Sequence, residues 1–270
     1  MKTIILLFSF LFIFSSRADI FVLDNLTEQQ FKNVANEVGA NFVHSSVTTV
    51  DGRGKVFGFE VGVIVGATQS PEVESIAKSF DSSLDIGIIP HAGLMGQVSL
   101  PLGFHFEATM FPEKEISDLT LSTFSGAVKY TLTNSLFKLP IIDLAIRAHY
   151  STSELSYNTD SNVASVPLNS KVTFDSSSWG IMAMTGADLL FVSPYIGIGY
   201  VSTDTSLGVN ATTGTIFDST FTNAQSAETD DSGMHFIIGT EVSLLLVHFG
   251  VEYAKIIDNE KATLKLSIGI

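Results

Sequence analysis

Cysteine is absent from the chain. A disulfide framework and a lipid anchor on an amino-terminal cysteine are therefore excluded, and stability has to come from packing and backbone pairing. Basic residues are also scarce, with 14 Lys and Arg against 28 Asp and Glu. Because a phosphate-binding surface needs clustered Lys and Arg, this balance argues against nucleic acid as a partner.

Long apolar runs are missing after the first segment of the chain. Residues 1–18 have the order of a secretory signal peptide, with Lys2, an apolar run over 4–14 and a small-x-small site ending at Ala18. No later run approaches the roughly 20 apolar residues of a transmembrane helix. The mean hydropathy is nevertheless +0.35. An exported chain of this kind fits a transmembrane β-barrel, in which only alternate residues meet lipid.

Residues 55–67, KVFGFEVGVIVGA, carry apolar side chains at every second position from Phe57 to Val65. This period of two is typical of a β-strand with one apolar face. The opposite face contains glycines and Glu60. Residues 261–270, KATLKLSIGI, repeat the pattern at the end of the chain. Matching first and last strands predict a sheet that closes on itself.

Alternating segments follow one another from residue 55 onward. Strands are predicted at 55–67, 90–100, 102–111, 119–131, 140–152, 171–184, 189–201, 233–243, 246–255 and 261–270. Short and long joints alternate between them, as periplasmic turns and external loops do in outer-membrane barrels. The longest predicted loops are 68–89, with a helix over 72–80, and 153–170 and 202–232. The predicted fold class is all-β, a single antiparallel transmembrane β-barrel of about ten strands with both termini in the periplasm.

Residues 19–50 differ from this pattern and predict a short amphipathic helix. Thr27 to Gln30 have capping-box spacing, apolar residues recur at helical intervals from Phe31 to Phe42, and Gly39 is the predicted stop. The helix either packs on the periplasmic mouth of the barrel or plugs the lumen. We favour the mouth, because the many polar residues of the helix need water or matched lumen partners. The chain divides into a signal peptide (1–18), a periplasmic leader (19–54) and a barrel (55–270).

Nearly all the ionisable residues within the predicted strands share the parity that faces the lumen. This predicted polar network consists of Glu60, His105, Glu107, Lys129, Asp143, Arg147, Glu241, His248, Glu252 and Lys265. A register error of one residue would move them into hydrocarbon, so the parity supports the orientation. Because a barrel of about ten strands is narrow, we expect a packed lumen with paired charges, Glu107 with Lys129 among them. A thin conduction path sensitive to histidine protonation is the alternative.

Catalytic and metal-binding patterns are not found. The histidines are scattered over different strands without HxH or HxxxH spacing, so neither a metal site nor a cofactor is predicted. His149 lies near Ser151 in the sequence, but no orienting carboxylate accompanies them. We therefore expect a protein that is not an enzyme, with an outer-membrane enzyme as the least favoured reading.

The whole chain after residue 18 resembles small bacterial outer-membrane barrels. The closing Leu264-x-Leu266-x-Ile268-x-Ile270 is similar to the signal read by the barrel-insertion machinery, although Ile270 stands where Phe is usual. The blocks KVFGFEVGVIVGAT, GLMGQVSLPLGFHFEATMFP and FVSPYIGIGYV resemble PopA-like barrels of predatory bacteria. That resemblance implies ring-shaped oligomers that enclose lipid. The amino-terminal leader also resembles fatty-acid transporters of the FadL type, which have more strands.

We therefore predict a protein of the bacterial outer membrane. Its expected role is structural or membrane-organising, and a narrow porin or FadL-like transporter of hydrophobic solutes is the alternative. The expected partners are membrane lipid, the insertion machinery during biogenesis and, in a homo-oligomer, further copies of the chain.

Overall fold

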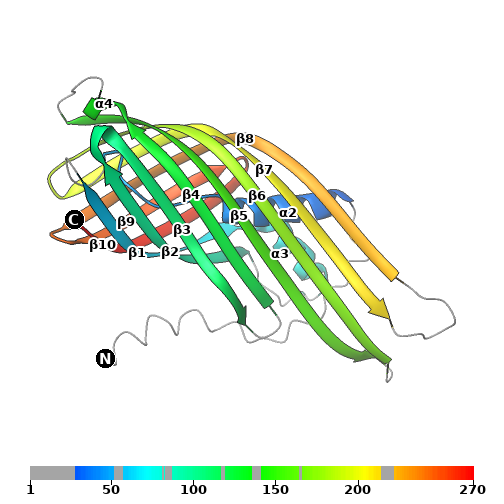
Figure 1. Ribbon diagram of the computed structural model, residues 1–270. Helices are drawn as coiled ribbons and strands as arrows, with labels where there is room; N and C mark the ends of the chain where they lie inside the picture. The colour runs from blue at the N-terminus through cyan, green and yellow to red at the C-terminus, as the bar shows by residue number, and fades with distance from the viewer. Residues whose placement is uncertain are drawn as a thin grey trace, which may run out of the picture.

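The computed structural model describes residues 28–51, 57–80, 82, 87–116, 119–135, 141–163, 166–213 and 222–270 (Figure 1). The predicted signal peptide lies outside these residues. No helix within the described ranges is long and apolar enough to cross a membrane.

Strands β1 to β10 form a closed antiparallel barrel in which each strand pairs with its neighbours in sequence, and β1 pairs with β10. The predicted fold class is thereby confirmed. The bounds are β1 Gly58–Gln69, β2 Ile88–Leu100, β3 Phe104–Ile116, β4 Leu119–Thr131, β5 Ile142–Val163, β6 Val166–Ala187, β7 Val192–Thr213, β8 Thr222–Leu244, β9 Val247–Ile256 and β10 Asn259–Gly269. Each predicted strand corresponds to one of these.

The two faces of the wall separate as the period of two requires. On β9, exposed and buried residues alternate without interruption, with Phe249 outside and Glu252 inside. The outside carries large aromatics toward the long-loop side, where Tyr150 pairs with Trp179, and Trp179 lies 6.3 Å from Tyr200. Phe104 and Tyr130 lie 4.7 Å apart toward the other side. The outer wall is therefore an apolar band with aromatic residues near both edges.

The barrel has two different ends. The end with the short turns, which we call the turn end, holds η3 (Pro101–Gly103), α4 (Leu132–Ser135) and the carboxyl terminus. The opposite, loop end holds α3 (Pro71–Phe80), which confirms the helix predicted over 72–80, and the tips of the long strands (Figure 1). At the turn end, Leu102, Leu190 and Leu245 have positive φ angles of 70°, 61° and 56° and are largely exposed.

Four strands extend far beyond the apolar band at the loop end. β5 to β8 have 22 or 23 residues, whereas the other six strands have 10 to 13. Ten additional residues add about 30 Å of strand. The loops predicted at 153–170 and 202–232 are therefore wrong in their described parts, which continue the ladder. The alternation signal fades there because both faces of the extension are polar, while backbone pairing continues.

The amino-terminal residues lie inside the barrel. Helix α2 (Glu28–Phe42) is followed by residues 43–50, which we call the lumen segment and of which all but Thr49 are buried. The favoured position on the periplasmic mouth is therefore wrong, and the plug alternative describes the structure. The physical reason is that wall residues supply the matched polar partners, as shown below.

Gly39 does not end the helix, which continues to Phe42. A Cβ atom on Gly39 would lie 2.8 Å from Thr205 Oγ1, closer than ordinary van der Waals contact. The glycine therefore serves close approach of α2 to β7 instead of termination. This function of a mid-helix glycine cannot be distinguished from a helix stop by sequence spacing.

Candidate functional site

Glu107 on β3 is the centre of the contacts between the wall and the lumen segment. Its carboxylate accepts hydrogen bonds from Ser46 Oγ at 2.5 Å and Thr48 Oγ1 at 2.7 Å, and lies 3.3 Å from His44 Nε2. Lys129 Nζ on β4 lies 3.0 Å from Glu107 Oε1, so the pairing predicted for these two residues is confirmed. One buried carboxylate thus joins the wall charge network to three side chains of the lumen segment.

Lysines of the wall also bind the backbone of the amino-terminal residues. Lys261 Nζ donates to the carbonyl oxygens of Asn41 at 2.9 Å and Val43 at 2.7 Å. Lys129 Nζ donates to the carbonyl oxygen of Thr49. An extended segment inside a barrel has carbonyl groups that need donors, and these ammonium groups supply them.

A second charge cluster lies between β1, β8 and β10. Lys265 Nζ is 2.8 Å from Glu60 Oε1 and 2.5 Å from Glu241 Oε2. Ser267 Oγ donates to Glu60 at 2.5 Å, and His248 Nδ1 lies 3.8 Å from Glu241 Oε1. A single cation therefore bridges two buried carboxylates.

The ten residues of the predicted polar network all have the inward parity, and nine of them are buried. The structure brings them into the Glu107 cluster with Lys129 and Arg147, and the Lys265 cluster with Glu60, Glu241 and His248. The remaining three are separate. Glu252 accepts from Ser45 and Tyr195, His105 hydrogen-bonds Ser99 and Thr131, and Asp143 accepts from Thr133 near the turn end.

Asp143 belongs to a separate group of three carboxylates. Its carboxylate, with those of Asp51 and Asp188, offers oxygen atoms within 4.8 Å of one another. These residues come from the end of the lumen segment, β5 and the β6–β7 turn, so no sequence spacing could connect them. Carboxylates alone do not define a cation site.

The buried lumen charges balance. Apart from Glu37 at the loop end, four buried cations face four buried carboxylates among the described residues, namely Lys129, Arg147, Lys261 and Lys265 against Glu60, Glu107, Glu241 and Glu252. Buried charges are tolerated when they are paired, so this equality allows a dry lumen. A pocket between the lumen segment and the wall of β1 to β4 has a volume of about 40 Å³, room for little more than one water molecule.

Several lumen residues were missed in the sequence. The run VHSSVTT at 43–49 lies within the predicted leader. Its small hydroxyl side chains and its lack of charge are compatible with a hydroxyl-rich lumen wall. Lys261 has the inward parity of Lys265 but stood at the predicted strand boundary. Tyr195 has the inward parity of β7 and is buried, but the predicted network contains only charged residues and histidines.

Arg147, His149 and His235 form a region with spare hydrogen-bonding capacity. Arg147 Nε and Nη1, both ring nitrogens of His149 and Nδ1 of His235 are buried and have no hydrogen-bond partner in the part of the chain that the structure describes. The rings of His149 and His235 have centroids 5.6 Å apart, and His149 stacks on His44 at 6.0 Å. Most buried polar groups in proteins have a protein or ordered-water partner, so these atoms are exceptions that need an explanation.

At the loop end, α2 and α3 are joined by Glu37. Its carboxylate accepts hydrogen bonds from the backbone amides of Glu72 at 2.7 Å and Val73 at 3.0 Å, at the amino end of α3. These amides have no partner within the helix, so the side chain caps it. Burial raises the pKa of the Glu37 carboxyl above its usual range, and the two amide hydrogen bonds oppose that shift.

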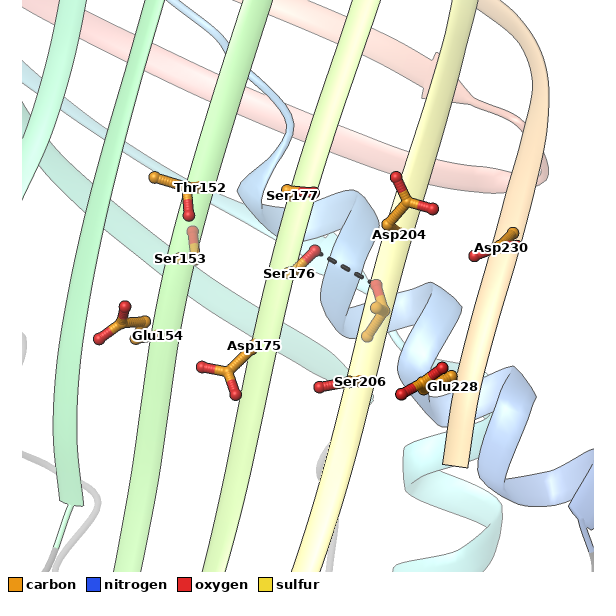
Figure 2. Close-up of a pocket in the computed structure, with 11 residues that line it drawn as sticks. Thr152, Ser153, Glu154, Asp175, Ser176, Ser177, Asp204, Ser206, Glu228 and Asp230 are labelled. Carbon is orange, nitrogen blue, oxygen red and sulfur yellow. Dashed lines mark hydrogen bonds between the residues drawn. The ribbon is translucent and has the colours of Figure 1, made fainter. Parts of the chain in front are cut away.

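The outer face of the β5–β8 extension is acidic. Figure 2 shows this part of the sheet with α2 behind it. The side chains drawn there line a shallow cavity of about 430 Å³. Glu154 pairs with Asp175, and Asp204 with Asp230, directly across neighbouring strands. Like charges in these positions destabilise a sheet, so packing does not explain them. The Ser176–Thr205 hydrogen bond of 3.2 Å lies on the inner side, toward α2.

Tyr195 covers Gly239 directly across the β7–β8 ladder. A Cβ atom on Gly239 would lie 2.5 Å from the Tyr195 ring, whose hydroxyl donates to Glu252 at 2.9 Å. We expect Gly239→Val to displace the ring and lower the free energy of unfolding by about 1–3 kcal/mol. Urea titration of the refolded barrel measures this. Gly96→Val is the matched control, because a Cβ atom on Gly96 would meet nothing closer than 3.9 Å. Equal stability of both variants would contradict the prediction.

Three solved structures with a similar fold are remote from this chain in sequence. The translocator domain of the autotransporter NalP from Neisseria meningitidis is 8% identical over 80% of this chain and 89% of that chain, with a TM-score of 0.43. Ail, the attachment invasion locus protein of Yersinia pestis, is 11% identical over 78% and 96%, with a TM-score of 0.30. The toluene transporter TbuX of Ralstonia pickettii is 7% identical over 80% and 89%, with a TM-score of 0.27. At these values the similarities carry no functional inference.

The comparison with curated proteins gave no match. One family model, described as a family of unknown function (DUF6588), matches residues 3–270. Since the match covers almost the entire chain, the protein belongs to the DUF6588 family.

Proposed function

We propose that this protein is a closed barrel of the bacterial outer membrane with a structural or membrane-organising role. Outward-facing Phe, Val, Leu and Ile side chains surround the wall, and aromatic residues lie near both edges of this band. Such a surface is stable in hydrocarbon and unstable in water. The turn end would face the periplasm and the loop end the exterior, as in bacterial barrels generally.

The observation that carries this proposal is the filled lumen. The lumen segment is held by Glu107, Lys129, Lys261 and Glu252, and the charges around it are balanced. A permanent aqueous pore would need an open path lined by hydrated groups. A barrel that is closed in this way presents its outer surfaces for function, above all the β5–β8 extension.

The proposed role involves no catalysis, and it is compatible with either a monomer or an oligomer. The ring-shaped oligomers implied by the PopA-like resemblance remain a prediction. The mass of the purified barrel in detergent tests it, because a monomer would exclude a ring.

We expect reconstituted full-length protein to give no steady conductance in planar bilayers, because the lumen segment blocks the path. The measurement is single-channel current at moderate voltage, with a known open porin as the positive control. Stable channels with a conductance comparable to that porin would overturn the closed-barrel proposal.

A narrow transporter is the second candidate, favoured by the spare polar atoms of Arg147, His149 and His235. If these atoms bind a passing solute, uptake into liposomes should saturate with solute concentration and fall in Arg147→Met. A resting protein without conductance but with saturable uptake would support this candidate over the structural one.

A further inference from the structure

The amino-terminal part of the chain passes through the lumen from the loop end to the turn end. In the β8 extension, Asp231 Oδ2 accepts from Asn36 Nδ2 at 2.9 Å. Farther along the chain, His44 hydrogen-bonds Ser125 at 2.8 Å. The carbonyl oxygen of Val50 accepts from Thr131, the last residue of β4, at 2.9 Å. The contacts therefore descend steadily to the turn end, where β1 begins.

Helix α2 leaves the lumen at the loop end. Residues 39–42 at its carboxyl end are buried, whereas Gln29 near its amino end is exposed. The helix has 15 residues, and at 1.5 Å per residue it is about 22 Å long. In Figure 1 it lies in the half of the barrel that holds the long strands. Gln29 is therefore on the side of the β5–β8 extension.

The described lumen residues do not favour a second passage of the chain beside the lumen segment. The pocket between the lumen segment and the wall of β1 to β4 has a volume of about 40 Å³, close to the volume of one water molecule. A second passage of the backbone would also need donors for its carbonyl groups. Lys129 and Lys261 already bind carbonyl groups of the first passage.

We propose that the amino end of helix α2 lies on the exterior of the outer membrane, and that the chain crosses this membrane through the lumen of its own barrel between α2 and β1. This inference rests on the proposed function for the statement that the loop end faces outward. An even number of strands by itself returns both ends of the barrel to the periplasm. The lumen passage separates the amino end of α2 from the carboxyl terminus, which stays at the turn end.

Cysteine labelling of intact cells tests the inference, since the natural chain contains no cysteine and gives no background. The reagent is a maleimide on a polyethylene glycol chain that is too large to pass through porins. Three single variants are compared: Gln29→Cys at the amino end of α2, Asp258→Cys in the exposed β9–β10 turn of the loop end, and Asp188→Cys in the exposed β6–β7 turn of the turn end. Labelling is read as a mass shift on a denaturing gel before and after permeabilisation.

We expect Gln29→Cys to be labelled on intact cells to the same extent as Asp258→Cys, while Asp188→Cys is labelled only after permeabilisation. If Gln29→Cys behaves like Asp188→Cys while Asp258→Cys is labelled on intact cells, the lumen passage is overturned and the membrane orientation stands. If Asp258→Cys is protected on intact cells, the proposed orientation itself fails. If the three variants are found in the soluble periplasm, the membrane location fails.

Discussion

Replacing Glu107 by Ala should lower the free energy of unfolding by about 3–5 kcal/mol, because it leaves the buried Lys129 ammonium without its carboxylate partner. Lys129 Nζ lies 3.0 Å from Glu107 Oε1, and both side chains are inaccessible to solvent. The same substitution removes the acceptor for Ser46 and Thr48 of the lumen segment. The variant should therefore loosen the plug as well as the wall.

Two measurements separate these effects. Urea titration of the refolded protein gives the loss of stability, and bilayer recordings report whether transient channels appear. Glu228→Ala is the matched control, because this carboxylate is exposed on the outer face of the extension. Glu107→Gln keeps one oxygen acceptor without the charge and should fall between the wild type and Glu107→Ala. A Glu107→Ala variant as stable as Glu228→Ala would mean that the lumen is hydrated and its charges are screened.

Replacing Lys265 by Met should have an effect of the same size, about 3–5 kcal/mol, for the reverse reason. Met removes the cation that lies 2.8 Å from Glu60 and 2.5 Å from Glu241. The two carboxylates then face each other in a buried region without it. The repulsion between these buried carboxylates is then no longer compensated, and this lowers the free energy of unfolding.

A compensating variant tests whether the charge cluster is the cause. Lys265→Met combined with Glu60→Gln and Glu241→Gln should recover most of the stability, since the uncompensated charges are gone. The measurement is again the urea midpoint of unfolding. If the triple variant is no more stable than Lys265→Met, lost packing of the lysine chain, and not electrostatics, explains the defect.

The amino-acid sequence by itself determined the wall of the barrel. Period-two alternation in segments such as 55–67 and 261–270 fixed which residues face outward, because a strand displaced by one residue would expose Glu60 or Lys265 to hydrocarbon. The same parity placed Glu107 and Lys129 on the inner face, on strands that follow each other in sequence. Antiparallel neighbours joined by short turns pair locally, so their contact could be predicted.

The tertiary structure alone decided what fills the lumen and how far the sheet extends. Residues 43–50 carry no charged side chain and show no clear hydrophobic periodicity. Their hydrogen-bond partners on β3, β4, β9 and β10 are 59 to 218 positions away in the chain. Gly39 reads as a helix stop until Thr205 is known to lie against it. The Ser- and Thr-rich ends of β5 to β8 read as loops, because alternation marks a strand only where one face meets an apolar medium and the other a polar one. Where water lies on the outside and hydroxyl groups line the inside, only backbone pairing across the completed sheet distinguishes strand from loop.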